Sequence, residues 1–319
     1  MVITQKNLYT ILCVLFAIIL SVILFPLYVN GDQIAYRGFF ENCLTYEKDI
    51  KVKWYCYNGY LGSKEPGYFL IMNYLGSVFG GFYLNVIFNG FLVYLISVLV
   101  CNNIKSNIER VFILLLMITN FYVLVLFFSA ERLKFAFVFF MAFLVFRGVK
   151  QKIFIIFSLL THVQILILFI SFYIRFIYDS NLSILRKNLI NFIASVFLFL
   201  FLVFNKNHLI YKINVYSTLV QEVDSGFLSL LKVSVIYFIT LFSYPRLSVI
   251  LAGIPILISA YFLGSSRIMM LMFLFYFFVI ILLKKKTDIL FYLILFYFSF
   301  KSFDFILNII SYGDGFNLS

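Results

Sequence analysis

Charge is scarce in this chain, and its scarcity excludes a soluble globular protein. Only 12% of the 319 residues are charged, whereas 64% are hydrophobic and 44 are phenylalanine. Apolar runs of about twenty residues recur along the sequence, and lipid leaves no way to satisfy open strand edges. The sequence therefore predicts an all-α fold. We expect a polytopic transmembrane helical bundle of about nine to ten membrane segments, forming a single integral membrane domain over residues 1–319.

Motifs for nucleotide binding and for common hydrolytic chemistry are also absent. The chain has no phosphate-binding GxxxxGK, no HExxH, no GxSxG and no Rossmann-type GxGxxG. It has 2 histidines, and His162 has no second histidine or cysteine at ligand spacing. We therefore expect no metal and no cofactor. Any work that the protein does must draw on a membrane gradient, an activated substrate or another subunit.

The net charge of +12 does not indicate a nucleic acid partner. Lysine and arginine lie in short connectors between apolar runs, which is the positive-inside pattern that orients helices in a membrane. Lys284, Lys285 and Lys286 belong to this pattern. The first apolar run, residues 8–29, is too long for a typical signal peptide, so we predict that it is the first transmembrane helix.

Two polar stretches interrupt the apolar pattern. Residues 30–64 form the longest, predicted to be an extracytoplasmic loop, and residues 205–226 form a second polar loop. Cys43 and Cys56 share the first loop, where a disulfide and two free thiols are both consistent with the sequence. Further spans are expected at about residues 82–100, 111–128, from 131 to near 146, 189–204, 227–242, 247–263, 268–283 and 289–310.

The apolar run at residues 153–174 conflicts with the positive-inside pattern, because basic connectors flank it on both sides. Either the run is broken or re-entrant, or one connector departs from the pattern, which is a bias and not a law. The polar stretch from Thr161 to Gln164 lies in its middle. Polar groups at membrane depth are tolerated where they are buried in protein or line a cavity, so a break at this place is physically reasonable.

Charged residues inside or beside apolar runs are the candidate functional residues. An ionisable group at such a place is costly, so it indicates function by default, although anchoring at the membrane interface is the alternative. An arginine suits phosphate oxygens because its planar fork donates two hydrogen bonds. A histidine suits proton transfer, or else serves as a hydrogen-bonded structural group. Five places qualify: Asp32 with Arg37, Glu65, Glu131 with Arg132 and Lys134, His162, and Arg267.

The segments that carry these residues resemble the EpsG family of bacterial membrane proteins, which is grouped with Wzy-type polysaccharide polymerases. They are GDQIAYRGFF, SKEPGYFLIMNYLG, SAERLKFAFVFFMAF, FSLLTHVQILILFI and GSSRIMMLMF, in the family's order. One departure is that Leu133 follows Arg132, where the family pattern has glutamine. The family's pattern falls here on Asp32 and Tyr36, Glu65, Arg132, His162 and Arg267.

The resemblance implies a membrane glycosyltransferase in the bacterial inner (cytoplasmic) membrane. Such an enzyme transfers a glycan from undecaprenyl diphosphate to a lipid-linked acceptor repeat unit at the outer face. Arg132 or Arg267 would stabilise the departing diphosphate. Asp32, Glu65 or His162 would orient or deprotonate the acceptor hydroxyl. The implied partners are the undecaprenyl-diphosphate-linked oligosaccharide, the lipid bilayer, and flippase and chain-length regulator proteins, with Tyr36, Arg37, Lys134 and Gln164 as substrate-binding residues.

Three other classes of protein fit parts of the sequence. A lipid-linked oligosaccharide flippase or transporter would line its substrate path with the same charges, although these charges gather at segment ends rather than in mid-helix. A membrane acyltransferase is supported by the histidine at membrane depth alone. A structural scaffold would use the charged residues as anchors.

Overall fold

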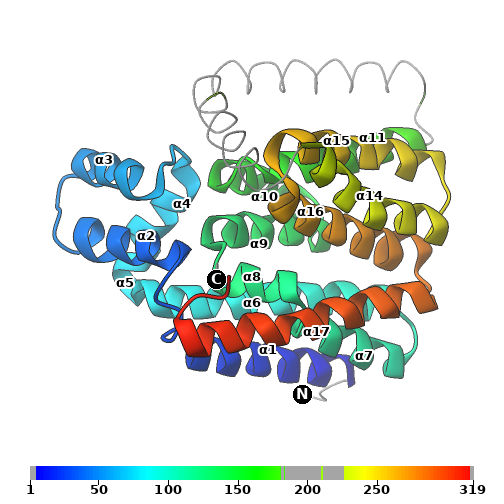
Figure 1. Cartoon of the computed structure of the whole chain (residues 1–319), viewed down its shortest axis with the longest axis horizontal. Helices are drawn as coiled ribbons and strands as arrows, with labels where there is room; N and C mark the ends of the chain where they lie inside the picture. Colours follow the sequence, from blue (N-terminus) through cyan, green and yellow to red (C-terminus); the bar gives the residue numbers. More distant parts are fainter. Residues whose placement is uncertain (1–4, 181–182, 184–209, 211–225, 317–319) are drawn as a thin grey trace. The chain divides into compact units, whose positions relative to one another are not determined.

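Every element that the structure describes is a helix, and these residues contain no strand. The structure is a computed structural model, and it describes residues 5–180, 183, 210 and 226–316. The chain divides into two compact units, residues 1–165 with 285–319, and residues 166–284 (Figure 1). The predicted all-α class is confirmed for the described residues, whereas one domain over 1–319 stays a prediction.

The first unit carries most of the helices. The amino-terminal helix α1 packs against α6 and α17, and α9 packs against α6, α8 and α10 (Figure 1). The α-helices are α1 (Gln5–Leu24), α2 (Asp32–Gly38), α3 (Ile50–Leu61), α4 (Pro66–Ile71), α5 (Ser77–Phe79), α6 (Gly81–Asn103), α7 (Asn107–Ile118), α8 (Phe121–Phe128), α9 (Glu131–Val145), α10 (Val149–Thr161) and α17 (Ile289–Tyr312). Two π-helical turns, η1 (Phe39–Leu44) and η2 (Met72–Gly76), complete it.

The second unit contains α11 (Ile165–Asp179), α14 (Gly226–Ser243), α15 (Leu247–Leu263), α16 (Ser265–Phe278) and the π-helical turn η3 (Val279–Lys284). Helices α14, α15 and α16 pack against one another, and Phe172 of α11 contacts Phe275 and Phe278 of α16. The predicted span at residues 189–204 lies outside the described residues, as does nearly all of the predicted polar loop at 205–226.

Long apolar helices indicate a multi-pass membrane protein. Within the described residues, 5 helices are long and apolar enough to cross a membrane, or up to 6 if the bent pair α7 and α8 forms one span. Helix α1 exposes Leu12, Ile19 and Ile23, as expected for a helix that faces lipid. Helices α10 and α15 are apolar but shorter. The predicted count of nine to ten segments therefore stays a prediction.

The predicted span at residues 111–128 corresponds to two helices with a bend between them. Helix α7 ends at Ile118, α8 begins at Phe121, and the two axes differ by 49°. The Asn120 side chain accepts a hydrogen bond from the backbone N–H of Tyr122 at 3.0 Å and so caps α8. Asparagine is a preferred residue at helix starts, and its capping bond begins a new helix inside an apolar run.

Of the two alternatives for the run at residues 153–174, the structure has the broken run. Helix α10 ends at Thr161, and α11 begins at Ile165. His162 has an extended backbone, with φ −157° and ψ 122°. The side of the membrane on which each connector lies stays a prediction.

The polar stretch at residues 30–64 is helical for much of its length. It contains α2, η1 and α3, and a disulfide joins Cys43 to Cys56, with the two Cα atoms 5.9 Å apart. Of the two alternatives for these cysteines, the structure has the disulfide. Buried aromatic rings fill the space between these helices and α4, including those of Phe39, Tyr57 and Tyr68. The stretch is therefore a folded cap, and its buried core continues into α4, α6 and α9 through Tyr68, Leu84 and Phe135.

Candidate functional site

Glu65 occupies a helix start that the local sequence specifies. It is the N-cap residue of α4, and Pro66 takes the first helical position, where its missing N–H costs nothing. The next residue, Gly67, lies against the end of α10. A Cβ atom at Gly67 would stand 2.7 Å from backbone atoms of Leu160 and Thr161. Only glycine allows this close approach, which brings the start of α4 to the break at His162.

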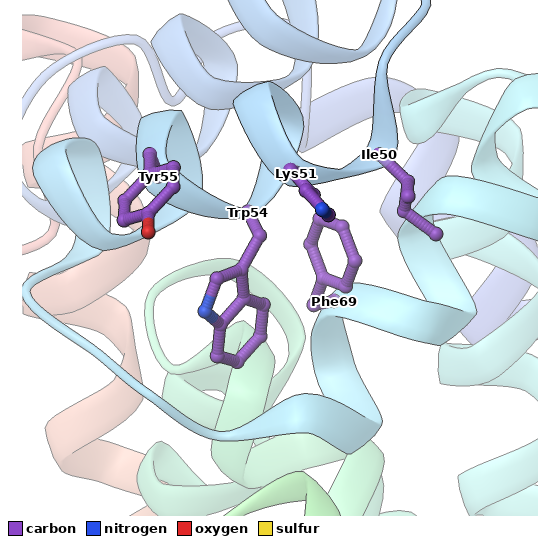
Figure 2. Close-up of a pocket in the computed structure, with 5 residues that line it drawn as sticks. All are labelled: Ile50, Lys51, Trp54, Tyr55 and Phe69. Carbon is purple, nitrogen blue, oxygen red and sulfur yellow. The ribbon is translucent and has the colours of Figure 1, made fainter.

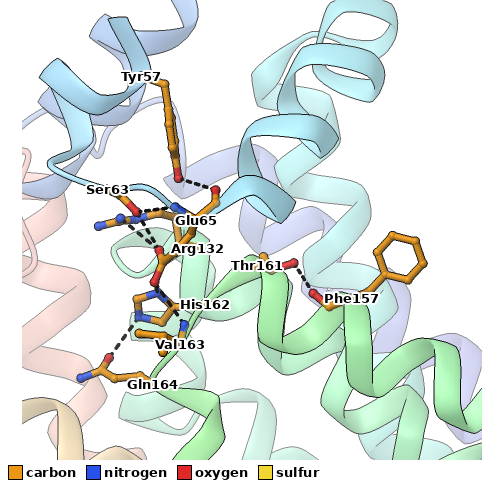
Figure 3. Close-up of polar contacts among 9 residues, drawn as sticks. All are labelled: Tyr57, Ser63, Glu65, Arg132, Phe157, Thr161, His162, Val163 and Gln164. Atoms are coloured by element: carbon orange, nitrogen blue, oxygen red, sulfur yellow. Dashed lines mark hydrogen bonds and ion pairs between the residues drawn. The ribbon is translucent and has the colours of Figure 1, made fainter. Parts of the chain in front are cut away.

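The helix break supplies both a side chain and a free backbone donor to Glu65 (Figure 3). Nδ1 of His162 lies 2.7 Å from Oε1 of Glu65, and the backbone N–H of Val163 donates to the same oxygen at 3.1 Å. The carboxylate thus satisfies a backbone N–H that the broken helix leaves without a helical partner. The helix break exposes a backbone donor that needs an acceptor, and the Glu65 carboxylate supplies that acceptor.

Arg132, in the first turn of α9, completes an ion-pair cluster that we call the Glu65 cluster: Glu65, Arg132 and His162 (Figure 3). Nη1 of Arg132 lies 3.2 Å from Oε2 of Glu65, and Ser63 Oγ donates to this oxygen at 2.9 Å. The side chain of Glu65 is 4% exposed and that of Arg132 is 14% exposed. Nε of Arg132 is buried and has no hydrogen-bond partner among the described residues. The cluster therefore keeps an unused cationic donor.

The hydrogen bonds of His162 depend on its protonation. An ionised carboxylate only accepts, so Nδ1 facing Glu65 carries a proton. Nε2 lies 3.1 Å from Oε1 of Gln164, and in this orientation of the amide the contact is a hydrogen bond only when the ring is an imidazolium. In that protonation state the cluster holds two positive charges and one negative charge. Rotation of the Gln164 amide would present its NH2 group to a neutral ring, so Gln164 can accompany a change of protonation.

Two tyrosines from the cap surround the cluster. The Tyr57 hydroxyl donates to the backbone carbonyl of Glu65 at 3.1 Å, and the Tyr36 phenol interacts with the Arg132 guanidinium. Burial raises the pKa of both Tyr36 and Tyr57 above the ordinary value of 10.0, and the positive charge of Arg132 opposes this shift. Both phenols are therefore neutral at physiological pH, and the Tyr36 oxygen can accept from Arg132 while the Tyr57 hydroxyl donates.

Among the other predicted residues near the cap, Asp32 and Arg37 do not join the Glu65 cluster. Asp32 is exposed and accepts a hydrogen bond from Ser129 at 3.1 Å. Nη2 of Arg37 donates to the carbonyl oxygens of Phe25 and Tyr28 at 2.9 and 3.0 Å. Within the described residues, no hydrogen bond or ion pair joins either side chain to Glu65, Arg132 or His162.

Lys134 and Arg267 lie in different units of the chain. Lys134 is 0% exposed, and its ammonium donates to Asn85 Oδ1 at 2.7 Å and to the carbonyl oxygen of Phe127 at 3.1 Å. These contacts indicate that Lys134 stabilises the fold. Arg267 lies in the first turn of α16, in the second unit. The structure thus brings together Glu65, Arg132 and His162, with Tyr36 and Gln164 beside them.

A second polar network lies beside the cluster, and sequence reasoning did not predict it. The Gln33 amide nitrogen donates to Glu131 Oε1 at 2.9 Å, and the Tyr68 hydroxyl donates to Glu131 Oε2 at 2.9 Å. Glu131 was among the charged residues at segment ends, but nothing marked Gln33 or Tyr68. A polar residue on the buried face of a seven-residue helix is visible only once the helix is known.

An open pocket of about 460 Å³ lies on the cap, away from these networks (Figure 2). The Trp54 ring meets the Phe69 ring edge to face, with the centroids 5.1 Å apart. The pocket contains the Lys51 ammonium and no carboxylate, so it lacks an acid–base pair. Its lining residues are Ile50, Lys51, Trp54, Tyr55 and Phe69. Elsewhere in the described residues, no three His, Cys, Asp or Glu side chains lie close enough together to hold a metal ion.

Comparisons of the chain with known protein families, with characterised proteins and with solved structures found no match. The geometry of the candidate site is therefore what indicates its chemistry. A buried carboxylate holds an arginine and a histidine, and the arginine retains an unused donor. Such a cluster can bind an anion and can move a proton.

Proposed function

We propose that this protein is a polysaccharide repeat-unit polymerase, a glycosyltransferase of the bacterial cytoplasmic membrane. Its donor would be a glycan on undecaprenyl diphosphate, and its acceptor a second lipid-linked repeat unit at the outer face. The observation that carries the proposal is the Glu65 cluster, where the Arg132 guanidinium and the His162 ring both lie against one buried carboxylate. When His162 is protonated, the cluster carries an excess positive charge, which suits a diphosphate leaving group.

The absence of nucleotide motifs from the sequence agrees with this chemistry. A lipid diphosphate sugar is already activated, so the transfer needs no nucleotide. In the reaction, the acceptor hydroxyl oxygen bonds to the anomeric carbon of the donor. The bond from that carbon to the diphosphate oxygen breaks, and the electron pair leaves with the diphosphate.

Each member of the cluster has a part in this proposal. Arg132 would stabilise the negative charge that develops on the diphosphate, using donors that Glu65 leaves unused. The His162 imidazolium would add a second charge and a proton. Glu65 would be a positioning residue, because its carboxylate is occupied by Arg132, His162, Ser63 and the Val163 N–H. Arg267 stays a second candidate for binding the diphosphate.

Deletion of the gene, followed by gel analysis of surface polysaccharide, tests the proposed function. Loss of a polymerase leaves single repeat units displayed at the surface, with no ladder of longer chains. Loss of a flippase leaves no repeat units outside, and that result would replace polymerisation by transport. A ladder of normal length would contradict both functions.

A further inference from the structure

A cavity of about 540 Å³ in the first unit is lined by two residues, Gln33 and Arg37, that each keep a buried polar atom without a partner among the described residues. Its volume lies within the range of about 300–1,000 Å³ that is typical of small-molecule sites. Aromatic side chains surround it, and Phe79 and Tyr83 are both partly exposed. Its polar lining residues are Gln33, Tyr36, Arg37, Glu41, Asn85 and Glu131.

Gln33 leaves a buried acceptor unused beside this cavity. The residue is 0% exposed, and its amide nitrogen donates to the Phe128 carbonyl at 2.6 Å and to Glu131 Oε1 at 2.9 Å. These two acceptors fix the amide orientation, since the opposite one would set oxygen against oxygen. Gln33 Oε1 is then left with no hydrogen-bond partner among the described residues. A buried unsatisfied oxygen calls for a donor.

Arg37 leaves a buried donor unused at the same cavity. Its Nη2 is bound by backbone carbonyl oxygens, but its Nε is buried without a partner in the described part of the chain. One lining residue therefore lacks a donor and another lacks an acceptor among the described residues. A hydroxyl group supplies both, because its hydrogen donates and its lone pairs accept.

Glu131 adds a carboxylate that neutral groups hold in place. Its two oxygens accept from the Gln33 amide and the Tyr68 hydroxyl, and no Lys or Arg of the described residues lies within ion-pair distance of it. With Arg37, Glu41 and Glu131 in the lining, the cavity carries one positive and two negative charges. That balance disfavours a diphosphate and favours a neutral, hydroxyl-rich ligand.

We propose that this cavity binds a neutral sugar ring, which Gln33, Arg37 and Glu131 hold by its hydroxyl groups. On the proposed polymerase function, the ring is the acceptor sugar, and its hydroxyl proton passes to Glu131 as the oxygen attacks the donor. Glu131 and Arg132 are neighbours in the first turn of α9. Tyr36 lines the cavity and also interacts with Arg132, so it connects the sugar site to the diphosphate site.

Saturation-transfer NMR tests the sugar site without any turnover. The full chain is placed in nanodiscs of phosphatidylethanolamine and phosphatidylglycerol, and methyl galactoside, methyl glucoside and N-acetylglucosamine are offered at millimolar concentration. We expect saturation transfer to at least one sugar. Tyr83→Ala should weaken binding about tenfold, as expected for the loss of one good contact. Tyr83 is 64% exposed and lines the cavity.

Tyr74→Ala is the matched control, because Tyr74 is 60% exposed on the neighbouring turn η2 and does not line the cavity. It should bind as the wild type does. Gln33→Leu, which removes the buried acceptor, should also abolish saturation transfer, and thermal unfolding shows whether this variant is folded. No transfer to any of the sugars, or equal binding by Tyr83→Ala and the wild type, would overturn the proposal.

The sugar site and the proposed function can fail separately. Sugar binding that Tyr83→Ala weakens, together with a normal polysaccharide ladder after gene deletion, would keep the site and remove the polymerase. A ladder lost on deletion, together with no sugar binding by the purified protein, would keep the polymerase and remove this site.

Discussion

Two cations on helix α9, the partly exposed Arg132 and the buried Lys134, have different surroundings. Lys134 is 0% exposed, and within the described residues its ammonium donates to two neutral oxygens, Asn85 Oδ1 and the Phe127 carbonyl oxygen. Arg132 faces the Glu65 carboxylate, has a side chain that is 14% exposed and keeps a buried N–H without a partner in the described chain. A cation whose bonds go to neutral protein oxygens supports the fold. A cation with an unused N–H donor can bind a ligand through that donor.

The largest expected effect of a substitution is at Arg132. Arg132→Ala should reduce polysaccharide chain growth by about 100-fold to 1,000-fold, because one preorganised donor to developing charge contributes that much. Arg132→Lys should restore little, since a point charge lacks the planar fork. Ladder length on gels, normalised to protein in the membrane, gives the measurement.

Arg175→Ala is the matched control for Arg132→Ala. Arg175 pairs with Asp179 at 3.2 Å, four residues along α11, and both side chains are more exposed than Arg132. Chain growth should stay normal in this variant. A ladder of normal length from Arg132→Ala, in protein present at the wild-type level, would remove Arg132 from the site.

The contacts of Lys134 predict that its substitution lowers the stability of the protein. Lys134→Ala removes a buried side chain and leaves Asn85 Oδ1 and the Phe127 carbonyl without their donor. We expect the free energy of unfolding to fall by about 3 kcal/mol. Chemical denaturation in detergent micelles measures it. An unchanged denaturation midpoint would mean that Lys134 does not stabilise the fold as its contacts indicate.

The next effect concerns Gly67, which sets the position of Glu65. Gly67→Ala forces apart backbone atoms that a Cβ would approach to 2.7 Å, so it should destabilise the protein by about 1–3 kcal/mol. Gly59→Ala is the control, because nothing lies within 4 Å of a Cβ at Gly59. Equal thermal unfolding of the two variants would contradict the close approach of α4 to α10.

A smaller effect is expected at high pH from Tyr57. Burial raises its pKa above the ordinary value of 10.0, so the folded state keeps a proton that the unfolded chain loses. The stability from this neutral phenol is fully present below about pH 10 and falls above it by about 1.4 kcal/mol per pH unit. Unfolding of the wild type and of Tyr57→Phe should therefore diverge in slope above about pH 10. Parallel slopes would contradict a buried, neutral Tyr57.

Much of the helical pattern could be predicted from the sequence. The helix start at Glu65 and Pro66 and the apolar helices of the second unit follow from proline and hydrophobic runs. The polar interruption from Thr161 to Gln164 left a break as one of two alternatives, and the structure has the break. The bend before α8 was missed, because Asn120 breaks the run through a single capping bond. The sequence predicts where helices start and end when the residue that starts or ends the helix acts directly on the adjacent backbone.

The candidate site could be predicted only in part. Glu65, Arg132 and His162 were found because charge is costly beside apolar runs, and folding brings them together. Asp32 was a candidate for the same reason, yet it bonds to Ser129 instead. Which charges meet depends on packing over long separations in sequence, and the sequence carries no local sign of the Gln33 and Tyr68 contacts with Glu131.

The most direct test of the central claim is polymerisation by the purified protein alone. The full chain is reconstituted in lipid vesicles with undecaprenyl-diphosphate-linked repeat units from the native organism, and the product length is read on a gel. The Glu65 cluster predicts chains longer than one repeat unit with the wild type and single units with Arg132→Ala. Single units with the wild type, or equal chains from both proteins, would contradict the account.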